Sequence, residues 1–163
     1  MRFYLLDKIT KFEIGKTAEG VKCWSLSDDI FNEHFPGYPV VPGVLLIESM
    51  AQLLGILIER SRLVEFPDTK GVFVILSIVH KAKFRKIIIP GDKCILKATL
   101  KSLDINRGTG SATVKVGDKL MAEAELSFVI GSRSELPDNK FIDRREEYIN
   151  ILFMQNPQRD IES

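Results

Sequence analysis

The segment that most constrains the fold is a long apolar stretch in the first half of the chain. From Pro42 to Arg60 the sequence reads PGVLLIESMAQLLGILIER, which favours a helix because strong helix formers follow an initial proline. Apolar side chains fall on nearly every side of this helix: Leu46, Ile47, Met50, Ala51, Leu54, Leu57 and Ile58. A helix that is apolar all round must be enclosed by other elements of the protein.

The β-rich remainder of the first 130 residues supplies the elements that could enclose it. Runs at residues 8–14, 21–27, 71–79, 81–89, 94–103, 111–116 and 120–130 are typical of strands, because they alternate or stay apolar between turn residues. A length of 163 residues fits one domain. One buried helix and about five or six antiparallel strands predict an α+β fold, with a curved sheet around a central helix.

Composition excludes several classes of protein. Lys plus Arg is 23 and Asp plus Glu is 22, so the net charge of +1 gives no argument for nucleic acid or an anionic membrane. The apolar segment carries Glu48 and Gln52 near its middle, which favours a buried helix over a membrane span. The start of the chain does not read as a signal peptide. Cys23 and Cys94 match no metal spacing, so we expect a cytoplasmic protein with reduced thiols and no metal site.

Glu48 raises a chemical question, because a carboxylate inside an apolar helix is costly unless it is hydrogen-bonded, paired or protonated. Gln52, one turn on, is a weak candidate partner, and His34 is a stronger one because it precedes the rigid loop that feeds the helix. Imidazole can accept a proton near neutral pH, and an acid in an apolar pocket can donate one. The N–H of Gly43 at the helix start can stabilise negative charge on a carbonyl oxygen. Together these groups suit proton abstraction next to a carbonyl.

Each of these residues also has a purely structural interpretation. His34 could hydrogen-bond a loop carbonyl, and Glu48 could be a buried acid tied to the backbone. Spacing leaves open whether His34 meets Glu48 of its own chain or that of a symmetry-related copy. Considered jointly, at the Pro- and Gly-rich approach to a buried helix, the two residues favour a functional site.

The stretch HFPGYPVVPGVLLIESMAQ, residues 34–52, closely resembles the HFPGxPxxPGVxxxExMAQ signature of the bacterial 3-hydroxyacyl-acyl-carrier-protein dehydratases. KAKFRKIIIPGDKCILKATL (81–100) and KLMAEAELSF (119–128) are similar to later blocks of that family. The resemblance covers roughly residues 3–130. It implies the hotdog fold, a curved antiparallel sheet around one long helix. It also implies removal of water from (3R)-3-hydroxyacyl chains carried on the phosphopantetheine arm of acyl carrier protein, giving trans-2-enoyl products for fatty acid or related lipid biosynthesis, without metal or other cofactor.

The same resemblance implies a role for each candidate residue. His34 corresponds to the base at C2, Glu48 to the acid at the 3-hydroxyl, and Gly43 to the N–H that polarises the thioester carbonyl. Gln52 matches the glutamine that supports the glutamate. In the family, histidine and glutamate come from different subunits of a homodimer, and dimers often assemble into hexamers. Glutamate at position 48 resembles the plain dehydratases more than the bifunctional dehydratase-isomerases, whose acid is usually aspartate.

Further candidates lie around the second block. Phe84 is expected to face inward, as core or as part of an acyl tunnel, and Tyr38 to border the entrance to the site. Basic residues alternate along the same predicted strand, and either a solvated face or a docking patch for an acidic carrier protein explains them: Lys81, Lys83 and Arg85, with Lys86 adjacent.

Departures from the family pattern bear on pathway and substrate. Glu33 stands where the family commonly has glycine, and Ile87 where it usually has proline. We expect a hotdog domain at residues 1–131 and a charged C-terminal extension at 132–163 with a short amphipathic helix. The alternatives are a hotdog acyl thioesterase and a non-catalytic carrier-binding paralogue in a specialised lipid or polyketide pathway. The spacing of His34 and Glu48 argues against the first, and the presence of both argues against the second.

Overall fold

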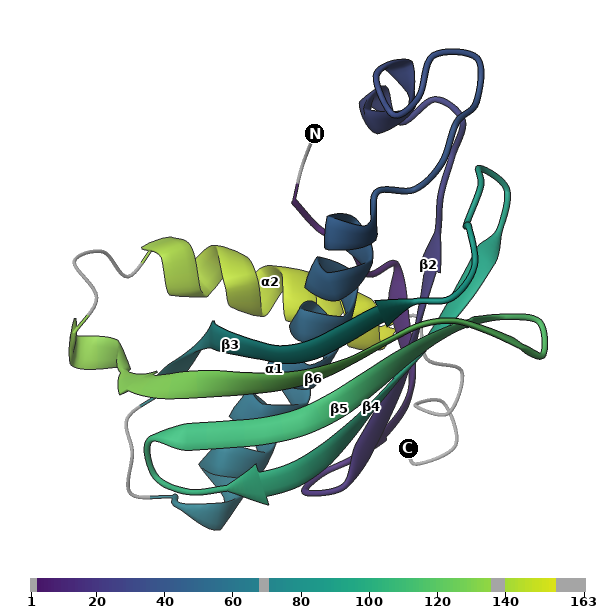
Figure 1. Ribbon diagram of the computed structural model, residues 1–163. Helices are drawn as coiled ribbons and strands as arrows, with labels where there is room; N and C mark the ends of the chain where they lie inside the picture. The colour runs from purple at the N-terminus through teal and green to yellow at the C-terminus, as the bar shows by residue number, and fades with distance from the viewer. Residues whose placement is uncertain (1–2, 68–70, 136–139, 155–163) are drawn as a thin grey trace.

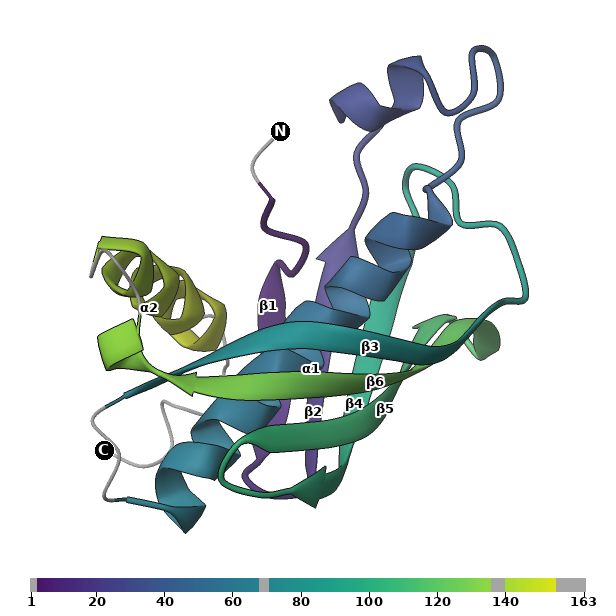
Figure 2. The same cartoon turned by 60° about the vertical axis from the view of Figure 1, so that its left-hand side comes forward.

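The computed structural model describes residues 3–67, 71–135 and 140–154 of the chain. Six antiparallel strands form one sheet in the order β1-β2-β4-β5-β6-β3. The sheet curves around the long helix α1 (Gly43–Glu65), as Figures 1 and 2 show. The strands are β1 (Lys8–Glu13), β2 (Thr17–Cys23), β3 (Val72–Phe84), β4 (Lys93–Leu103), β5 (Arg107–Val116) and β6 (Lys119–Ser132). The predicted α+β architecture is confirmed.

The enclosed helix is the centre of the hydrophobic core. Leu53, Leu54 and Leu57 of α1 have no exposed surface, which confirms that the sheet wraps the helix. Two glycines of β5 let the helix approach closely. A Cβ at Gly108 would lie 2.8 Å from the side chain of Ile58, and one at Gly110 would lie 2.7 Å from that of Leu54. The tight fit of helix to sheet therefore needs residues without side chains at these two positions.

Several element boundaries differ from the sequence prediction, and β5 begins at Arg107, four residues before the predicted start. The runs at 71–79 and 81–89 belong to one strand, β3, which ends at Phe84 and has irregular register near Ser77 and His80. These bulges interrupt the alternation from which strands are predicted. β2 begins four residues before the predicted start, because the preceding turn centres on Gly15, with φ of +77°. α1 continues five residues past Arg60, to Glu65.

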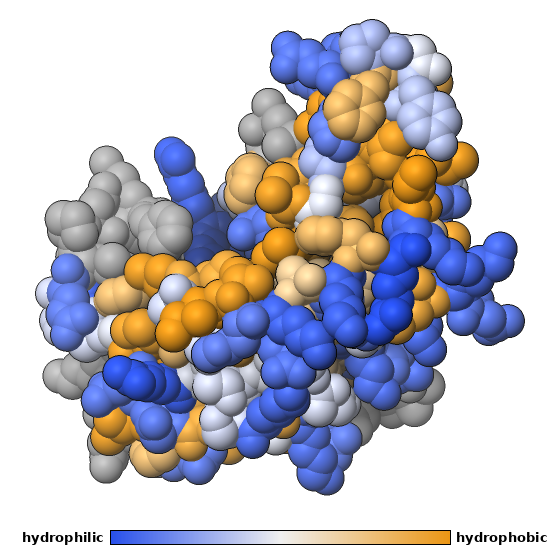
Figure 3. All heavy atoms as spheres, viewed as in Figure 1, coloured by the Kyte–Doolittle hydropathy of each residue, from blue (hydrophilic) through white to orange (hydrophobic). Residues whose placement is uncertain are grey.

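β3 forms an apolar edge of the sheet. It pairs with β6 and, among the described elements, with no other strand. Ile75, Ile78 and Val79 are 55%, 51% and 43% exposed, and Figure 3 shows apolar side chains gathered along this edge. A long apolar edge strand with unpaired backbone groups is a surface on which another chain can pair.

The C-terminal extension contains a helix that packs on the domain. The short helix expected near Tyr148 is longer than predicted: α2 spans Lys140–Met154, after a short 3-10 turn η2 (Arg133–Glu135). Ile149 and Leu152 of α2 are each 1% exposed, and the ring of Phe153 meets that of Phe12 edge-on. Figures 1 and 2 both place α2 beside α1 and β1. Ile149 and Leu152 of α2 are therefore part of the hydrophobic core.

None of the helices in residues 3–67, 71–135 and 140–154 is long and apolar enough to cross a membrane. The same part of the chain holds no cluster of three or more His, Cys, Asp or Glu side chains that could bind a metal ion.

The two cysteines should differ sharply in reactivity. Cys23 is exposed, whereas Cys94 is buried and its pKa is raised to about 12, chiefly by burial and then by the charge of Asp92. A raised pKa keeps the thiol protonated, so at pH 8 only about one Cys94 in ten thousand is a thiolate. Titration with a chromogenic disulfide should modify one thiol per native chain and two after unfolding in urea. Equal rates for both thiols in the native protein would contradict the placement of Cys94.

Candidate functional site

The loop that carries His34 is stiffened by its own backbone. It follows a short 3-10 helix, η1 (Asp29–Asn32), and precedes α1. The N–H of Val40 donates to the carbonyl of His34 at 2.9 Å, and Phe35 and Tyr38 exchange two hydrogen bonds of 3.0 and 2.9 Å. Gly37, with φ of +76°, makes the turn. The loop therefore holds the imidazole in a defined position at the approach to the helix.

The ring of His34 is oriented by one hydrogen bond. Its Nδ1 lies 2.9 Å from the carbonyl oxygen of Val40. A carbonyl can only accept, so Nδ1 must carry the hydrogen, and Nε2 is left as the nitrogen that can take a proton. The half-buried ring also stacks on Phe35, with centroids 4.1 Å apart. The predicted bond to a loop carbonyl is present, and it also fixes the tautomer that a base requires.

Glu48 is half-buried and held by Gln52. The side-chain N–H₂ of Gln52 donates to Glu48 Oε1 at 3.0 Å and to the carbonyl of Phe3 at 3.0 Å. Its Oε1 accepts from the N–H of Leu5 at 2.9 Å. Gln52 thus uses both ends of its amide to join the acid to the N-terminal segment. The role of this segment could not be predicted from the sequence, because a bond across 47 residues leaves no local pattern.

Within one chain the two candidate catalytic side chains stay apart. Among the hydrogen bonds and ion pairs of the described residues, none joins His34 to Glu48. Glu48 lines a cavity that His34 does not reach. The structure therefore brings Glu48 together with Gln52 and His34 together with Val40, and no hydrogen bond or ion pair of the described residues joins the two pairs within one chain.

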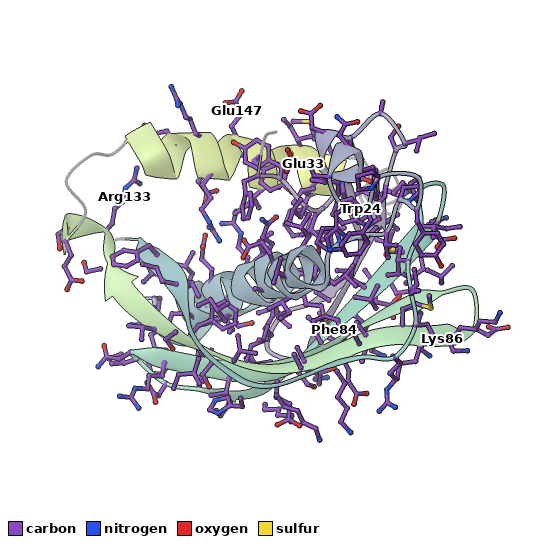
Figure 4. The ribbon with its side chains drawn as sticks, turned by 45° about the horizontal axis from the view of Figure 1, so that its top comes forward. Trp24, Glu33, Phe84, Lys86, Arg133 and Glu147 are labelled. Atoms are coloured by element: carbon purple, nitrogen blue, oxygen red, sulfur yellow. The ribbon has the colours of Figure 1, made fainter. Side chains whose placement is uncertain are left out.

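Gly43 begins α1, directly after Pro42 at the cap position. As the first helical residue it has an N–H that the hydrogen bonds of the helix do not use. A Cβ at this position would lie 2.9 Å from the ring of Phe84, so the phenyl group lies against the helix start. Phe84 is 52% exposed, so of the two alternatives it is not part of the core, and its place in an acyl tunnel stays a prediction. Figure 4 shows it at the edge of the sheet below α1.

A cavity of about 510 Å³ extends along α1 from Glu48. This size is within the range of small-molecule sites. Its helix wall consists of Glu48, Ala51, Gln52, Gly55 and Ile56. The strand wall is apolar and comes from Val74, Leu76 and Phe128, while Phe3, Tyr4 and α2 supply the rest. Figure 3 shows this face hollowed above the apolar edge of the sheet.

The remaining candidates lie on exposed surfaces. Tyr38 is 59% exposed at the loop and does not line the cavity. Arg85 pairs with Glu123 of β6 at 2.9 Å, and this hydrogen bond lowers the pKa of the Glu123 carboxyl, with the charges of Lys83 and Lys81 adding to it. Acidic residues therefore face the basic row across the strand pair. Lys86 lies just beyond the strand (Figure 4).

Comparison with solved structures identifies the fold of the chain. A hot-dog-like protein from Thermanaerovibrio acidaminovorans matches with a TM-score of 0.60 and 17% identity, covering 83% of this chain and 91% of that one. A thioesterase from Haemophilus influenzae matches with a TM-score of 0.59 and 13% identity, covering 80% and 81%. At these identities the likeness concerns the fold alone. The chain has the hotdog fold.

Sequence comparison gives the family. The model of the FabA-like domain matches residues 1–125. The 3-hydroxyacyl-acyl-carrier-protein dehydratase FabZ of Clostridium botulinum (strain Okra) is 43% identical over 129 residues, which cover 79% of this chain and 86% of that protein. The enzyme of the same name from Desulforamulus reducens is 38% identical over 131 residues, covering 80% and 89%. The chain belongs to the FabA-like family.

Replacing Gln52 by alanine should destabilise the protein by about 1–3 kcal/mol, because it leaves the N–H of the buried Leu5 without a partner and also removes the bond to the exposed carbonyl of Phe3. Urea unfolding measures this loss. Glu65→Gln, an exposed change at the end of the same helix, is the matched control and should change stability by less than about 0.5 kcal/mol. Equal stabilities of the two variants would show that Gln52 does not hold the N-terminal segment.

Proposed function

We propose that this chain dehydrates (3R)-3-hydroxyacyl chains carried on acyl carrier protein to trans-2-enoyl chains, in fatty acid biosynthesis. The observation that carries the proposal is the hydrogen bond from His34 Nδ1 to the Val40 carbonyl, which leaves Nε2 ready to accept a proton. Its context is a family whose named members, at 38–43% identity, are dehydratases. The thioesterase alternative rests on a fold likeness at 13% identity and is not favoured.

The chemistry follows from moving two protons. His34 Nε2 removes a proton from C2, and the thioester carbonyl draws the resulting charge toward its oxygen. The free N–H of Gly43 at the start of α1 stabilises that charge. Glu48 gives its proton to the 3-hydroxyl, which leaves as water while the electrons of the former C2–H bond form the C2=C3 double bond. Gln52, bonded to Glu48 Oε1, orients the acid so that its other oxygen faces the substrate.

A homodimer would complete the site. His34 and Glu48 of one chain are not joined, so a second chain must supply one member of the pair. The free edge of β3, with Ile75, Ile78 and Val79 exposed, supports pairing with the same strand of a second copy. Val44, 70% exposed on the first turn of α1, gives a further apolar contact near the site.

The other assignments follow from the same proposal. The substrate arrives on the phosphopantetheine arm of acyl carrier protein, and no metal or separate cofactor takes part. Phe84 and Tyr38 would border the channel, and the row from Lys81 to Lys86 would steer the acidic carrier. Residues 1–131 form the catalytic domain, dimers can assemble into hexamers, and the two free thiols fit the cytoplasm.

Loss of either member of the pair should abolish turnover. His34→Ala removes the base and Glu48→Gln the acid, so each should lower kcat by at least about 10²-fold. Incubation with 3-hydroxyacyl carrier and detection of both the enoyl product and thioester hydrolysis measures the effect. Asn32→Ala, an exposed change just before the loop, is the control. Hydrolysis without enoyl product would establish the thioesterase instead, and carrier binding without any turnover the non-catalytic paralogue.

Mixing the two inactive variants should restore activity. If each site takes His34 from one subunit and Glu48 from the other, a mixed dimer has one intact site and one doubly defective site. Random reassociation gives half mixed dimers, so the mixture should recover about a quarter of wild-type activity. Unfolding and refolding the variants together, then assaying enoyl formation, measures the recovery. No recovery, with mixed dimers demonstrated by tagged subunits, would place both residues of a site in one chain.

A further inference from the structure

We propose that α2 closes the distal end of the acyl-chain pocket and limits the length of chain that the site accepts, with Ile149 as the residue that sets the limit. This inference rests on the proposed function and adds the substrate range of the same site. The named dehydratase relatives align with about 130 residues of this chain, and the family model ends at residue 125, whereas α2 begins at Lys140. The helix that would form this wall therefore lies outside the domain that the family model matches.

The cavity has the chemistry of a hydrocarbon site. Beyond Glu48 and Gln52, its walls are Ala51, Gly55 and Ile56 of α1, three apolar side chains of the strands, and the rings of Phe3 and Tyr4. α2 adds Ile149 and the ring of Tyr148, and its two arginines, Arg144 and Arg145, are the charged groups of this wall. A saturated acyl chain attached at its reacting end near Glu48 would gain about fourfold in affinity for each methylene buried in such a pocket.

Contacts on both sides hold α2 across the pocket. Arg145 pairs with Glu59 of α1, and Arg60 pairs with Glu146 at 2.9 Å. Arg145 borders the cavity, but its positive charge is paired with the carboxylate of Glu59, which is only 2% exposed. On the other side the Tyr148 hydroxyl donates to the carbonyl of Leu6 at 2.9 Å and accepts from its N–H at 3.2 Å.

The position of these contacts determines the length of acyl chain that fits between Glu48 and α2. The cavity follows α1 from Glu48 to Ile56, eight residues or about 12 Å along the axis. α1 meets α2 at Glu59 and Arg60, the next turn after Ile56. An extended chain advances about 1.2 Å per bond, so roughly ten bonds fit between the acid and this crossing. With the reacting carbons added, chains of up to about twelve carbons should fit, and chains of sixteen should meet α2.

Two measurements on full-length variants test the limit. The first is kcat/KM for 3-hydroxyacyl carriers of eight to eighteen carbons. The second is the Kd of alkyl-pantetheine thioethers of the same lengths, which cannot turn over. Wild-type kcat/KM should fall at least about tenfold between twelve and sixteen carbons. Ile149→Ala should move the fall toward longer chains, and Ile149→Phe toward shorter ones. Leu152→Ala is the matched control, because Leu152 is equally buried on α2 but does not line the cavity.

The outcomes separate this inference from the proposed function. Turnover with a length profile that is the same in wild type and both Ile149 variants would overturn the inference and leave the dehydratase standing. Absence of turnover at every length would sink the dehydratase, while a Kd series that shifts with Ile149 would still support α2 as the wall. A shift produced equally by Leu152→Ala would mean that loosening of α2, and not the size of Ile149, sets the length, which also overturns the inference.

Discussion

The constraint on which the structure depends is that α1 is apolar around its whole circumference. Such a helix is stable in water only when other elements remove it from solvent, and here the curved sheet and α2 do so. The glycines of β5 allow this contact to be close. Because the enclosure is nearly complete, a polar group on the helix needs a hydrogen-bond partner or a cavity. The Ser49 hydroxyl donates to the carbonyl of Leu45 at 2.8 Å, and Glu48 lines the cavity along α1.

The candidate site around the enclosed helix consists of a few residues, each held by a neighbouring group. Gln52 holds Glu48 and fixes the N-terminal segment that forms one side of the cavity. The start of α1 offers a free N–H at Gly43, and the loop before it fixes the imidazole of His34 through Val40. In the proposed mechanism, the acid, the charge-stabilising N–H and the base therefore each have a rigid neighbour. The proposed homodimer would bring the base and the acid together, and the edge of β3, which pairs only with β6 among the described elements, is the expected surface for it.

The sequence predicted those features that depend on local patterns. The buried helix followed from unbroken apolar spacing. One helical turn made Gln52 only a weak candidate partner of Glu48, yet Gln52 is the residue bonded to it. β3 was predicted as two strands because its bulges break the alternation on which such predictions depend. Alternation correctly turned Phe84 toward the start of α1, but it could not show that the end of an edge strand leaves the ring outside the core. The docking of Tyr148 on Leu6 spans 142 residues and leaves no local signal.

The matched domain and the extension have different parts in the proposed site, because α2 contacts α1 far from the start of that helix. In the proposed mechanism, proton abstraction and proton return need a small set of groups near the start of α1, and all of these residues lie within the family domain. In the proposed pocket, chain length would be decided at the other end of the cavity, by the distance to the wall that α2 forms. A helix that follows the last strand can form that wall without moving the reacting groups, since it is attached to α1 one turn beyond Ile56. Under these two proposals, the chemistry and the substrate range would be set by different parts of the chain.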